Sequence, residues 1–225
     1  MKKVELIETR DGSSSLFLPE LNETYHSTHG AIAEAYFVFI KNGIEHYLAT
    51  NQKTSINILE IGFGTGLNAL ITADFASNNN IDVHYSSLEP FPLDHSIIKQ
   101  LNYTAQLKTF DSKQFFQEIH AADWGKFYSI NQHFHLKKVK SPLLDFESST
   151  KFDLIFFDAF APSKQPEMWE ISIFEHLNKM MNEKAQLITY CAQGQFKRNL
   201  KSAGFEVQSL PGPPPKKEMV RGVKP

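Results

Sequence analysis

The chain has 225 residues, of which 41% are hydrophobic and 19 are Phe, so it is long enough to bury the core of one domain. Its formal net charge of −2 excludes a global basic field, and net charge alone therefore does not indicate a nucleic-acid partner. The single cysteine, Cys191, excludes an intrachain disulfide and the usual zinc spacings, and without a signal peptide or membrane-spanning run we expect a cytoplasmic protein with no membrane contact.

The N-terminal part of the chain has its own pattern. Residues 3–18 alternate around Asp11-Gly12, a turn signal that predicts a β-hairpin. Residues 28–41 then predict a helix that stops at Gly43, with one apolar face made of Ile32, Tyr36, Phe39 and Ile40. We treat residues 1–50 as an N-terminal hairpin-and-helix elaboration of a main domain that spans residues 51–225.

Strands and helices alternate in that main domain. The pattern predicts strands at 56–61, 83–88, 152–157 and 186–191, helices at 67–76 and 194–203, and a third helix with Ile173, Phe174, Leu177 and Met181 on one side. A terminal antiparallel strand pair is expected at 205–210 and 217–223, around a proline turn. The predicted fold is a Rossmann-like α/β domain with a mostly parallel seven-stranded sheet and helices on both faces. Ligands of such sheets bind beyond the carboxyl ends of the strands.

A glycine-rich turn follows the first of these strands. Gly62, Gly64 and Gly66 let the backbone turn sharply and leave it bare enough for a ligand to touch. A dinucleotide site normally has its third glycine where Leu67 stands, and the Glu60 carboxylate would repel a diphosphate. That carboxylate instead suits the ammonium and sulfonium groups of S-adenosylmethionine. The alternative is that these glycines serve turn geometry alone.

A second carboxylate, Glu89, ends the next predicted strand, where its two oxygens could accept hydrogen bonds from both ribose hydroxyls. The alternative for Glu89 is a solvated acid at a strand end. We predict that the cofactor-binding residues are Glu60, Gly62, Phe63, Gly64, Gly66, Asn68, Glu89 and Asp158. The expected cofactor is S-adenosylmethionine.

Asp158 begins a second motif, Asp158-Ala159-Phe160-Ala161-Pro162, which follows the most apolar strand. Methyl transfer needs alignment and an acceptor for the proton of the nucleophile. The motif is loosely similar to the Asp/Asn-Pro-Pro-aromatic signature of amino-directed methyltransferases. We predict that Asp158 is catalytic, orienting an amine and accepting its proton, with Phe160 packed beside the amine or the target base. The alternative is an Asp that caps the following helix.

Together these residues resemble a known family, the methyltransferase half of the bacterial bifunctional enzyme that completes 5-methylaminomethyl-2-thiouridine at the tRNA wobble position. The resemblance covers most of the chain, with order and spacing intact. It is carried by Asp11-Gly12, Glu34-Ala35-Tyr36-Phe37-Val38-Phe39, Glu60-Ile61-Gly62-Phe63-Gly64-Thr65-Gly66-Leu67-Asn68, Phe157-Asp158-Ala159-Phe160-Ala161-Pro162-Ser163-Lys164-Gln165-Pro166-Glu167-Met168-Trp169, Thr189-Tyr190-Cys191-Ala192-Gln193-Gly194, Lys197-Arg198, Ala203-Gly204-Phe205 and Lys216-Lys217-Glu218-Met219.

The resemblance implies methylation of the aminomethyl nitrogen of the wobble uridine, with S-adenosylmethionine as donor and tRNA as partner. The chain is similar to the stand-alone form of the family, so we expect no flavin and no obligatory protein partner. It also implies a site-wall role for Tyr25. The family has a Gly-Asp pair where Val139-Lys140-Ser141-Pro142 stands here, so the adenine partner stays unnamed, and Lys217 replaces an Arg of the family tail.

An anticodon loop is recognised by stacking and phosphate contacts, and the chain offers basic and aromatic candidates for both. They are Lys164, Trp169, Lys197, Arg198, Lys201, Lys216, Lys217 and Arg221, with a solvated basic face as the alternative. The predicted substrate-binding residues are Tyr25, Phe160, Pro162, Trp169, Lys197, Arg198 and Lys217. His133-Phe134-His135 lacks a third ligand at suitable spacing, so we predict an exposed strand there and no metal.

Three other functions fit parts of the pattern. A methyltransferase or an aminopropyltransferase acting on a small amine would use the same cofactor turn and Asp158. A non-catalytic cofactor-binding module could dock on another RNA-modification enzyme, and a dinucleotide oxidoreductase is disfavoured by Glu60 and Leu67. The sequence leaves open which tRNAs are used, whether the uridine must be thiolated, the oligomeric state, and the fold of residues 120–150.

Overall fold

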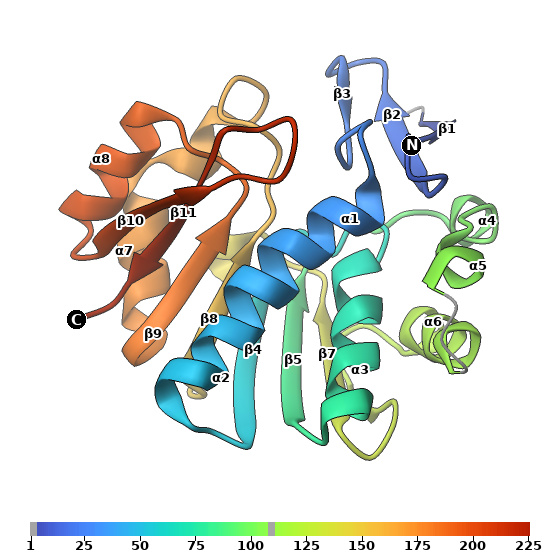
Figure 1. Ribbon diagram of the computed structural model, residues 1–225, viewed down its shortest axis with the longest axis horizontal. Helices are drawn as coiled ribbons and strands as arrows, with labels where there is room; N and C mark the ends of the chain where they lie inside the picture. The colour runs from blue at the N-terminus through green and yellow to red at the C-terminus, as the bar shows by residue number, and fades with distance from the viewer. Residues whose placement is uncertain (1–3, 108–110) are drawn as a thin grey trace.

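A computed structural model of the chain describes residues 4–107 and 111–225. Its main sheet has eight strands in the order β10-β11-β9-β8-β4-β5-β7-β6 (Figure 1). The five central strands run parallel: β4 (Ser55–Ile61), β5 (Asp82–Leu88), β7 (Phe134–Val139), β8 (Phe152–Phe157) and β9 (Met181–Thr189). The antiparallel strands lie at the edges: β6 (Phe127–Ser129), β10 (Glu206–Pro211) and β11 (Glu218–Val223). The predicted mostly parallel α/β fold with an antiparallel terminal pair is confirmed.

The sheet has one strand more than predicted, because β6 pairs with β7 at the far edge in the region whose fold the sequence left open. The same region contains the short 3₁₀ helix η2 (Leu143–Asp145). The third predicted helix is also shorter than its apolar pattern suggested, since Met181 is the first residue of β9 rather than part of α7 (Ile171–Lys179). Met181 is nevertheless buried, which explains why it continued the pattern.

Helices cover both faces of the sheet, and β8 shows why. All six of its residues are buried, and alternate side chains point to opposite faces. Phe156 belongs to a hydrophobic cluster with Leu70 of α3 (Leu67–Asn79), whereas Phe157 belongs to a second cluster with Phe174 of α7 and Phe196 of α8 (Gly194–Ser202). The two clusters are the two halves of the core, on either side of the sheet.

A long helical segment crosses the first face of the sheet, as α1 (Ala31–Ala35), the π-helix η1 (Tyr36–Glu45) and α2 (His46–Asn51). The prediction that this helix stops at Gly43 is wrong. Gly43 is buried inside η1, where a Cβ atom would lie 3.4 Å from Phe156 Cε1 and 3.5 Å from Ile188 Cγ2, which are ordinary van der Waals distances, so the helix continues through this position while packing on the sheet. The segment ends instead at Gln52, which has a left-handed backbone with φ of 50°.

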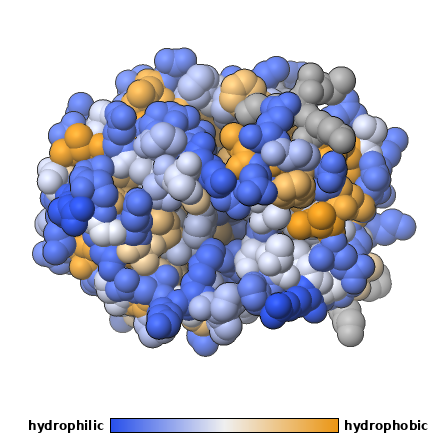
Figure 2. Space-filling model, turned by 90° about the horizontal axis from the view of Figure 1, so that it is seen from above, coloured by the Kyte–Doolittle hydropathy of each residue, from blue (hydrophilic) through white to orange (hydrophobic). Residues whose placement is uncertain are grey.

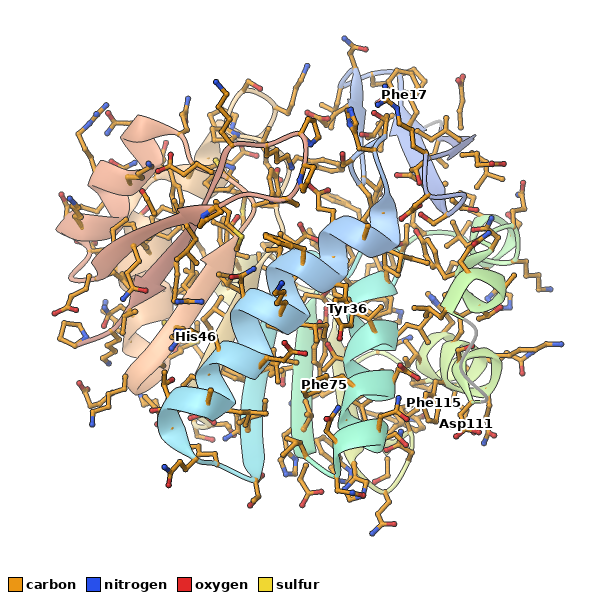
Figure 3. The ribbon with its side chains drawn as sticks, viewed as in Figure 1. Phe17, Tyr36, His46, Phe75, Asp111 and Phe115 are labelled. Carbon is orange, nitrogen blue, oxygen red and sulfur yellow. The ribbon has the colours of Figure 1, made fainter. Side chains whose placement is uncertain are left out.

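The π-helical turn also changes the buried face of this segment. Phe39 and Ile40 are buried as predicted, but Tyr36 is 45% exposed (Figure 3). A π-helix has more residues per turn than the 3.6 of an α-helix, so the apolar face moves away from positions chosen by α-helical spacing. Figure 3 also shows His46 beside β9, where Nδ1 lies 3.3 Å from Gln186 Oε1.

The predicted N-terminal hairpin is confirmed, with its expected first residue, 3, outside the described residues. It consists of β1 (Glu5–Glu8) and β2 (Ser14–Leu18), and β3 (Glu23–Thr24) adds a third antiparallel strand. Asp11 ties the hairpin turn to α1, because its Oδ1 accepts a hydrogen bond from Ser13 N at 3.0 Å and its Oδ2 accepts one from Ala33 N at 3.1 Å. This small sheet therefore sits above the carboxyl edge of the main sheet (Figure 1).

Four further helices complete the described fold: α4 (His95–Ile98), α5 (Tyr103–Leu107), α6 (Ser112–Ala121) and the 3₁₀ helix η3 (Pro166–Trp169). Within residues 4–107 and 111–225, no helix combines the length and the apolar character that crossing a membrane requires.

Candidate active site

A cavity of about 1100 Å³ lies at the carboxyl ends of β4, β5 and β8. Its floor is the glycine turn and the residues that follow β5 and β8, and its outer wall comes from the N-terminal sheet and the turn between β10 and β11. Figure 2 looks down on this edge of the sheet and shows the surface hollowed near its centre. The structure thus has its main cavity where a parallel α/β sheet is expected to bind its ligand.

The glycine turn forms the floor of this cavity. Gly62, Gly64 and Gly66 have φ of 92°, 50° and 74°, in the left-handed region that side chains disfavour. Neighbouring atoms also leave no room for a side chain here, since a Cβ atom on Gly62 would lie 2.9 Å from the Asp158 carbonyl oxygen. One on Gly64 would lie 3.1 Å from Tyr25 Cδ1. The bare backbone predicted from the sequence is therefore required by both its neighbours and its own dihedral angles.

Glu89 stands beside this turn and lines the cavity. Its Oε2 accepts a hydrogen bond from Gly64 N at 3.1 Å, and its Oε1 accepts one from Phe91 N at 2.9 Å. Each carboxylate oxygen can accept more than one hydrogen bond. The carboxylate is thus held in a fixed position at the cavity wall, where the predicted contact with ribose hydroxyls can be made.

Asp158 lines the opposite side of the glycine turn, directly after β8. Asn68, in the first turn of α3, donates from Nδ2 to Asp158 Oδ2 at 2.9 Å. Burial raises the pKa of the Asp158 carboxyl to about 7, and the Glu34 carboxylate raises it further, while the Asn68 hydrogen bond and the Lys216 ammonium act in the opposite direction. The side chain therefore exchanges its proton near neutral pH, as a general base requires.

Glu60 lies one layer deeper than predicted. It is completely buried and is absent from the cavity lining. Its Oε2 accepts a hydrogen bond from Ser87 Oγ at 2.5 Å. Burial raises the pKa of Glu60 to about 8, against the hydrogen bonds of Ser87, Asn68 and Tyr85, which favour the ionised form. In this arrangement Glu60 contacts Asn68 of α3 and lies outside the cavity lining, and its predicted contact with the cofactor stays a prediction.

The outer wall combines two predicted substrate-binding residues, Tyr25 and Phe160, with residues that the sequence analysis did not place in the site. Tyr25 packs edge-on against Phe160, with ring centroids 5.3 Å apart, which agrees with the site-wall position expected for Tyr25. Glu34 and Tyr190 also line the cavity, together with Lys216. Glu34 and Tyr190 lie on segments far apart in the sequence, so only the family resemblance, which includes both, could have indicated them.

Apart from Tyr25 and Phe160, none of the predicted substrate-binding residues lines the cavity. Trp169 is 3% exposed, packs edge-on between Phe157 and Phe196, and donates from Nε1 to the Phe160 carbonyl oxygen at 2.8 Å. Arg221 is likewise buried, donating from Nη2 to the Asn42 carbonyl oxygen at 2.6 Å. Both were candidates for RNA contact, and burial removes them from any RNA-accessible surface.

The remaining candidates are divided between the cavity lining and the surface outside it. Lys197 donates from Nζ to Glu218 Oε2 at 2.7 Å, and Arg198 is exposed and donates from Nη2 to Gln195 Oε1 at 2.7 Å. Pro162, Lys201 and Lys217 are also outside the lining, whereas Lys164 and Lys216 belong to it.

Of the His133-Phe134-His135 segment, Phe134 and His135 begin β7, with Phe134 buried, and His133 directly precedes the strand. His135 is partly exposed and stacks on His84, with ring centroids 5.0 Å apart. His133 Nδ1 lies 2.8 Å from Asp82 Oδ1. Among the described residues, no three His, Cys, Asp or Glu side chains are grouped as metal ligands would be.

The charged side chains of the cavity are mainly acidic. Six carboxylic residues line it, against three lysines: Glu23, Glu34, Glu89, Asp94, Asp158 and Glu167 against Lys140, Lys164 and Lys216. In a partly enclosed site such an excess favours cations, because field lines are focused between low-dielectric walls. The cavity is thus suited to a ligand or substrate that carries positive charge.

Comparison with known proteins decides what cofactor this site serves. The family model described as S-adenosyl-L-methionine-dependent methyltransferase matches residues 100–225, which is more than half of the chain. The chain belongs to this family.

The methyltransferase also matches curated relatives along nearly its whole length. A Leptospira interrogans protein named tRNA 5-methylaminomethyl-2-thiouridine biosynthesis bifunctional protein MnmC is 33% identical over 214 residues, covering 90% of this chain and 33% of that protein. The protein of the same name from Hydrogenovibrio crunogenus is 29% identical over 212 residues, covering 89% and 31%.

Solved structures share the fold of the methyltransferase. MNMC2 from Aquifex aeolicus superposes with a TM-score of 0.79 at 21% identity, covering 99% of this chain and 70% of that one. Spermidine synthase from Thermotoga maritima gives a TM-score of 0.58 at 12% identity, covering 98% and 68%. At these identities the likeness concerns the fold alone. The methyltransferase spans about a third of the length of the curated relatives that it matches.

The residues of the cavity fit S-adenosylmethionine. The glycine turn presents bare backbone to the cavity, and Glu89 is held at its edge with two acceptor oxygens. The acidic excess matches a cofactor that carries both an ammonium and a sulfonium group. Of the eight residues predicted to bind the cofactor, six line the cavity, namely Gly62, Phe63, Gly64, Asn68, Glu89 and Asp158, whereas Glu60 and Gly66 do not. Their contacts with the cofactor stay a prediction.

Proposed function

We propose that this methyltransferase methylates the aminomethyl nitrogen of 5-aminomethyl-2-thiouridine in tRNA, using S-adenosylmethionine as methyl donor. The observation that carries the proposal is the alignment of nearly the whole chain with relatives named for tRNA 5-methylaminomethyl-2-thiouridine biosynthesis, with 33% identity in the Leptospira protein. The site supports it independently, because an acidic cavity with a carboxyl group of pKa about 7 suits an amine nucleophile.

The residues of the site divide the work of such a transfer. Glu89 would hold the ribose hydroxyls and the glycine turn would contact the methionine part of the cofactor, which when bound would supply a methyl group on a cationic sulfur. The lone pair of the amine nitrogen would form the new N–C bond, and the electrons of the C–S bond would remain on sulfur. Asp158 accepts an N–H hydrogen bond, takes the proton that the nitrogen loses, and later releases it to water.

Positioning is the larger part of this catalysis, because an in-line displacement depends strongly on the angle and distance of attack. Asn68 fixes the Asp158 carboxyl by its hydrogen bond of 2.9 Å. The edge-to-face pair of Tyr25 and Phe160 closes the cavity beside Asp158, which excludes water and provides aromatic surface for the target base. Lys164, Lys140 and the nearby exposed Lys217 are the basic residues that we propose for phosphate contacts.

The proposal is tested by transfer of labelled methyl from S-adenosylmethionine to two tRNA pools, one carrying 5-aminomethyl-2-thiouridine and one lacking the aminomethyl group. We expect label in the first pool only, located on the modified uridine after digestion to nucleosides. Equal label in both pools, or none in either while cofactor binding is intact, would overturn the proposal. Methylation or aminopropylation of short diamines in a parallel assay would then select the small-amine function.

A further inference from the structure

A pair of opposite charges closes the outer wall of the cavity. Lys216 Nζ donates to Glu34 Oε1 at 2.5 Å. Glu34 belongs to α1, whereas Lys216 belongs to the proline turn between β10 and β11, which reaches across toward α1 (Figure 1). The two side chains are only 14% and 35% exposed, so water screens the pair less than it would screen a surface ion pair.

Both charges are held in place by further contacts. Glu34 Oε2 accepts a hydrogen bond from Ser27 N at 3.0 Å. Lys216 Nζ lies 4.0 Å from the centroid of the Tyr190 ring, and Tyr190 in turn donates from its hydroxyl to the Ala159 carbonyl oxygen at 2.9 Å. Ala159 is the residue after Asp158. The pair is therefore fixed relative to the proposed catalytic carboxyl, and all three charged groups line the same cavity.

We propose that Glu34 and Lys216 are positioning residues that set the proton affinity of Asp158 with opposite signs. The inference rests on the proposed role of Asp158 as proton acceptor. A negative charge near a carboxyl group favours its neutral form, and a positive charge favours its ionised form. Because each partner also neutralises the other, the complete pair leaves Asp158 able to titrate near neutral pH while keeping the wall closed.

Other titratable groups near Asp158 do not replace this pair. Glu60 on β4 has a pKa of about 8, raised partly by Asp158, so the two carboxyls oppose each other's ionisation in every variant of the pair alike. The pKa values of Tyr85 on β5 and Tyr190 after β9 lie well above their usual value because of burial, which leaves both phenols neutral. At the outer wall, Glu34 raises the pKa of Asp158 and Lys216 lowers it.

The test uses two variants that break the same ion pair. In Glu34→Gln a negative charge is lost, so the pKa of Asp158 should fall, whereas in Lys216→Met a positive charge is lost and the pKa should rise. We expect each midpoint to move by at least ~0.5 pH, as nearby charges commonly do. The double variant should return toward the wild-type value. The readout is the carboxyl carbon-13 resonance of Asp158, assigned by its loss in Asp158→Asn and followed by NMR from pH 4 to pH 9.

Lys217→Met is the matched control, because it removes the same charge from the adjacent, exposed residue outside the cavity lining and should leave the Asp158 titration unchanged. If the pair had only a structural role, Glu34→Gln and Lys216→Met would have the same effect on the titration midpoint of Asp158. Midpoints that move in the same direction, or do not move, would therefore overturn the inference. The titration is recorded without tRNA. A failure of methyl transfer would therefore count against the proposed function, and a failure of the opposite shifts against this inference.

Discussion

At the scale of single residues, the buried Glu60 should make the free energy of unfolding depend on pH. Its carboxyl has a pKa of about 8 in the folded chain, against 4.5 for an ordinary Glu, because burial disfavours the charge. Between these two pH values the folded state keeps a proton that the unfolded state has lost. Folding therefore takes up a proton, and the free energy of unfolding should decrease as pH rises from about 4.5 through about 8.

Glu60→Gln removes this titration, so the denaturant midpoint of the variant should depend less on pH over the same range. Asp158, whose pKa is also raised, will leave a smaller slope. The measurement is urea unfolding at several pH values from 4 to 9. The exposed Glu147 provides the control, since Glu147→Gln should keep the wild-type pH dependence. An equal slope in the Glu60→Gln variant and the wild type would show that Glu60 is ionised in the folded protein.

Asp158 carries the corresponding prediction for activity. Asp158→Asn keeps the shape and the neighbour Asn68 but cannot take a proton, so kcat/KM for methyl transfer should fall by ~10²–10⁴-fold. For the wild type, kcat/KM should rise as pH increases through about 7, because the ionised carboxyl is the acceptor. Cofactor affinity, measured by calorimetry, should change much less than the rate. A rate near that of the wild type would remove Asp158 from the mechanism.

At the scale of secondary-structure elements, we expect alanine substitution of two glycines to have opposite effects on the free energy of unfolding. In Gly62→Ala the new Cβ atom would lie 2.9 Å from the Asp158 carbonyl oxygen, on a backbone with φ of 92°. We expect a loss of ~1–3 kcal/mol in the free energy of unfolding and weaker cofactor binding. In Gly43→Ala the nearest side-chain atoms are 3.4 Å and 3.5 Å away, and Ala favours helices, so stability should be unchanged or higher by up to ~1 kcal/mol. The reverse order in chemical unfolding would contradict this account.

Trp169 tests whether a family motif acts through contact or through packing. Its ring packs between Phe157 and Phe196, so Trp169→Ala should lower the free energy of unfolding by ~3–5 kcal/mol. Trp169→Phe should keep much of the packing and lose mainly the hydrogen bond to the Phe160 carbonyl oxygen, worth ~1 kcal/mol. For Trp169→Phe we expect tRNA affinity close to that of the wild type in filter binding. A loss of tRNA affinity without a loss of stability would restore Trp169 as a substrate contact.

At the scale of the whole molecule, the limits of sequence reasoning follow from the distance over which each feature is determined. The strand, glycine turn and helix around Gly62 were predictable because turn chemistry and period are local. The burial of Glu60 was not, since a strand-end carboxylate has the same local pattern whether it lines a cavity or is buried. The Glu34–Lys216 ion pair could not be predicted from local sequence patterns either, because it joins residues 182 positions apart. Tyr36 shows the intermediate case, where one π-helical turn displaced an otherwise correct apolar face.

The division at residues 50 and 51 concerns the cooperativity of the whole chain. One hydrophobic cluster includes Val38, Phe39 and Ile44 from the first part and Ile58, Phe156 and Ile188 from the second. Removing the η1 helix from the sheet would expose this shared surface, so we propose that both parts unfold together as one unit.

Native-state hydrogen exchange tests this proposal. Amides of η1 and of β8 should converge on the same opening free energy as urea is added, because both are released only by global unfolding. The hairpin strand β1 serves as the comparison, since most of its residues are exposed and it should exchange through smaller local openings. Exchange of the η1 amides at a distinctly lower free energy than the β8 amides would mean that the helix leaves the sheet by itself, and residues 1–50 would then be a separate unit.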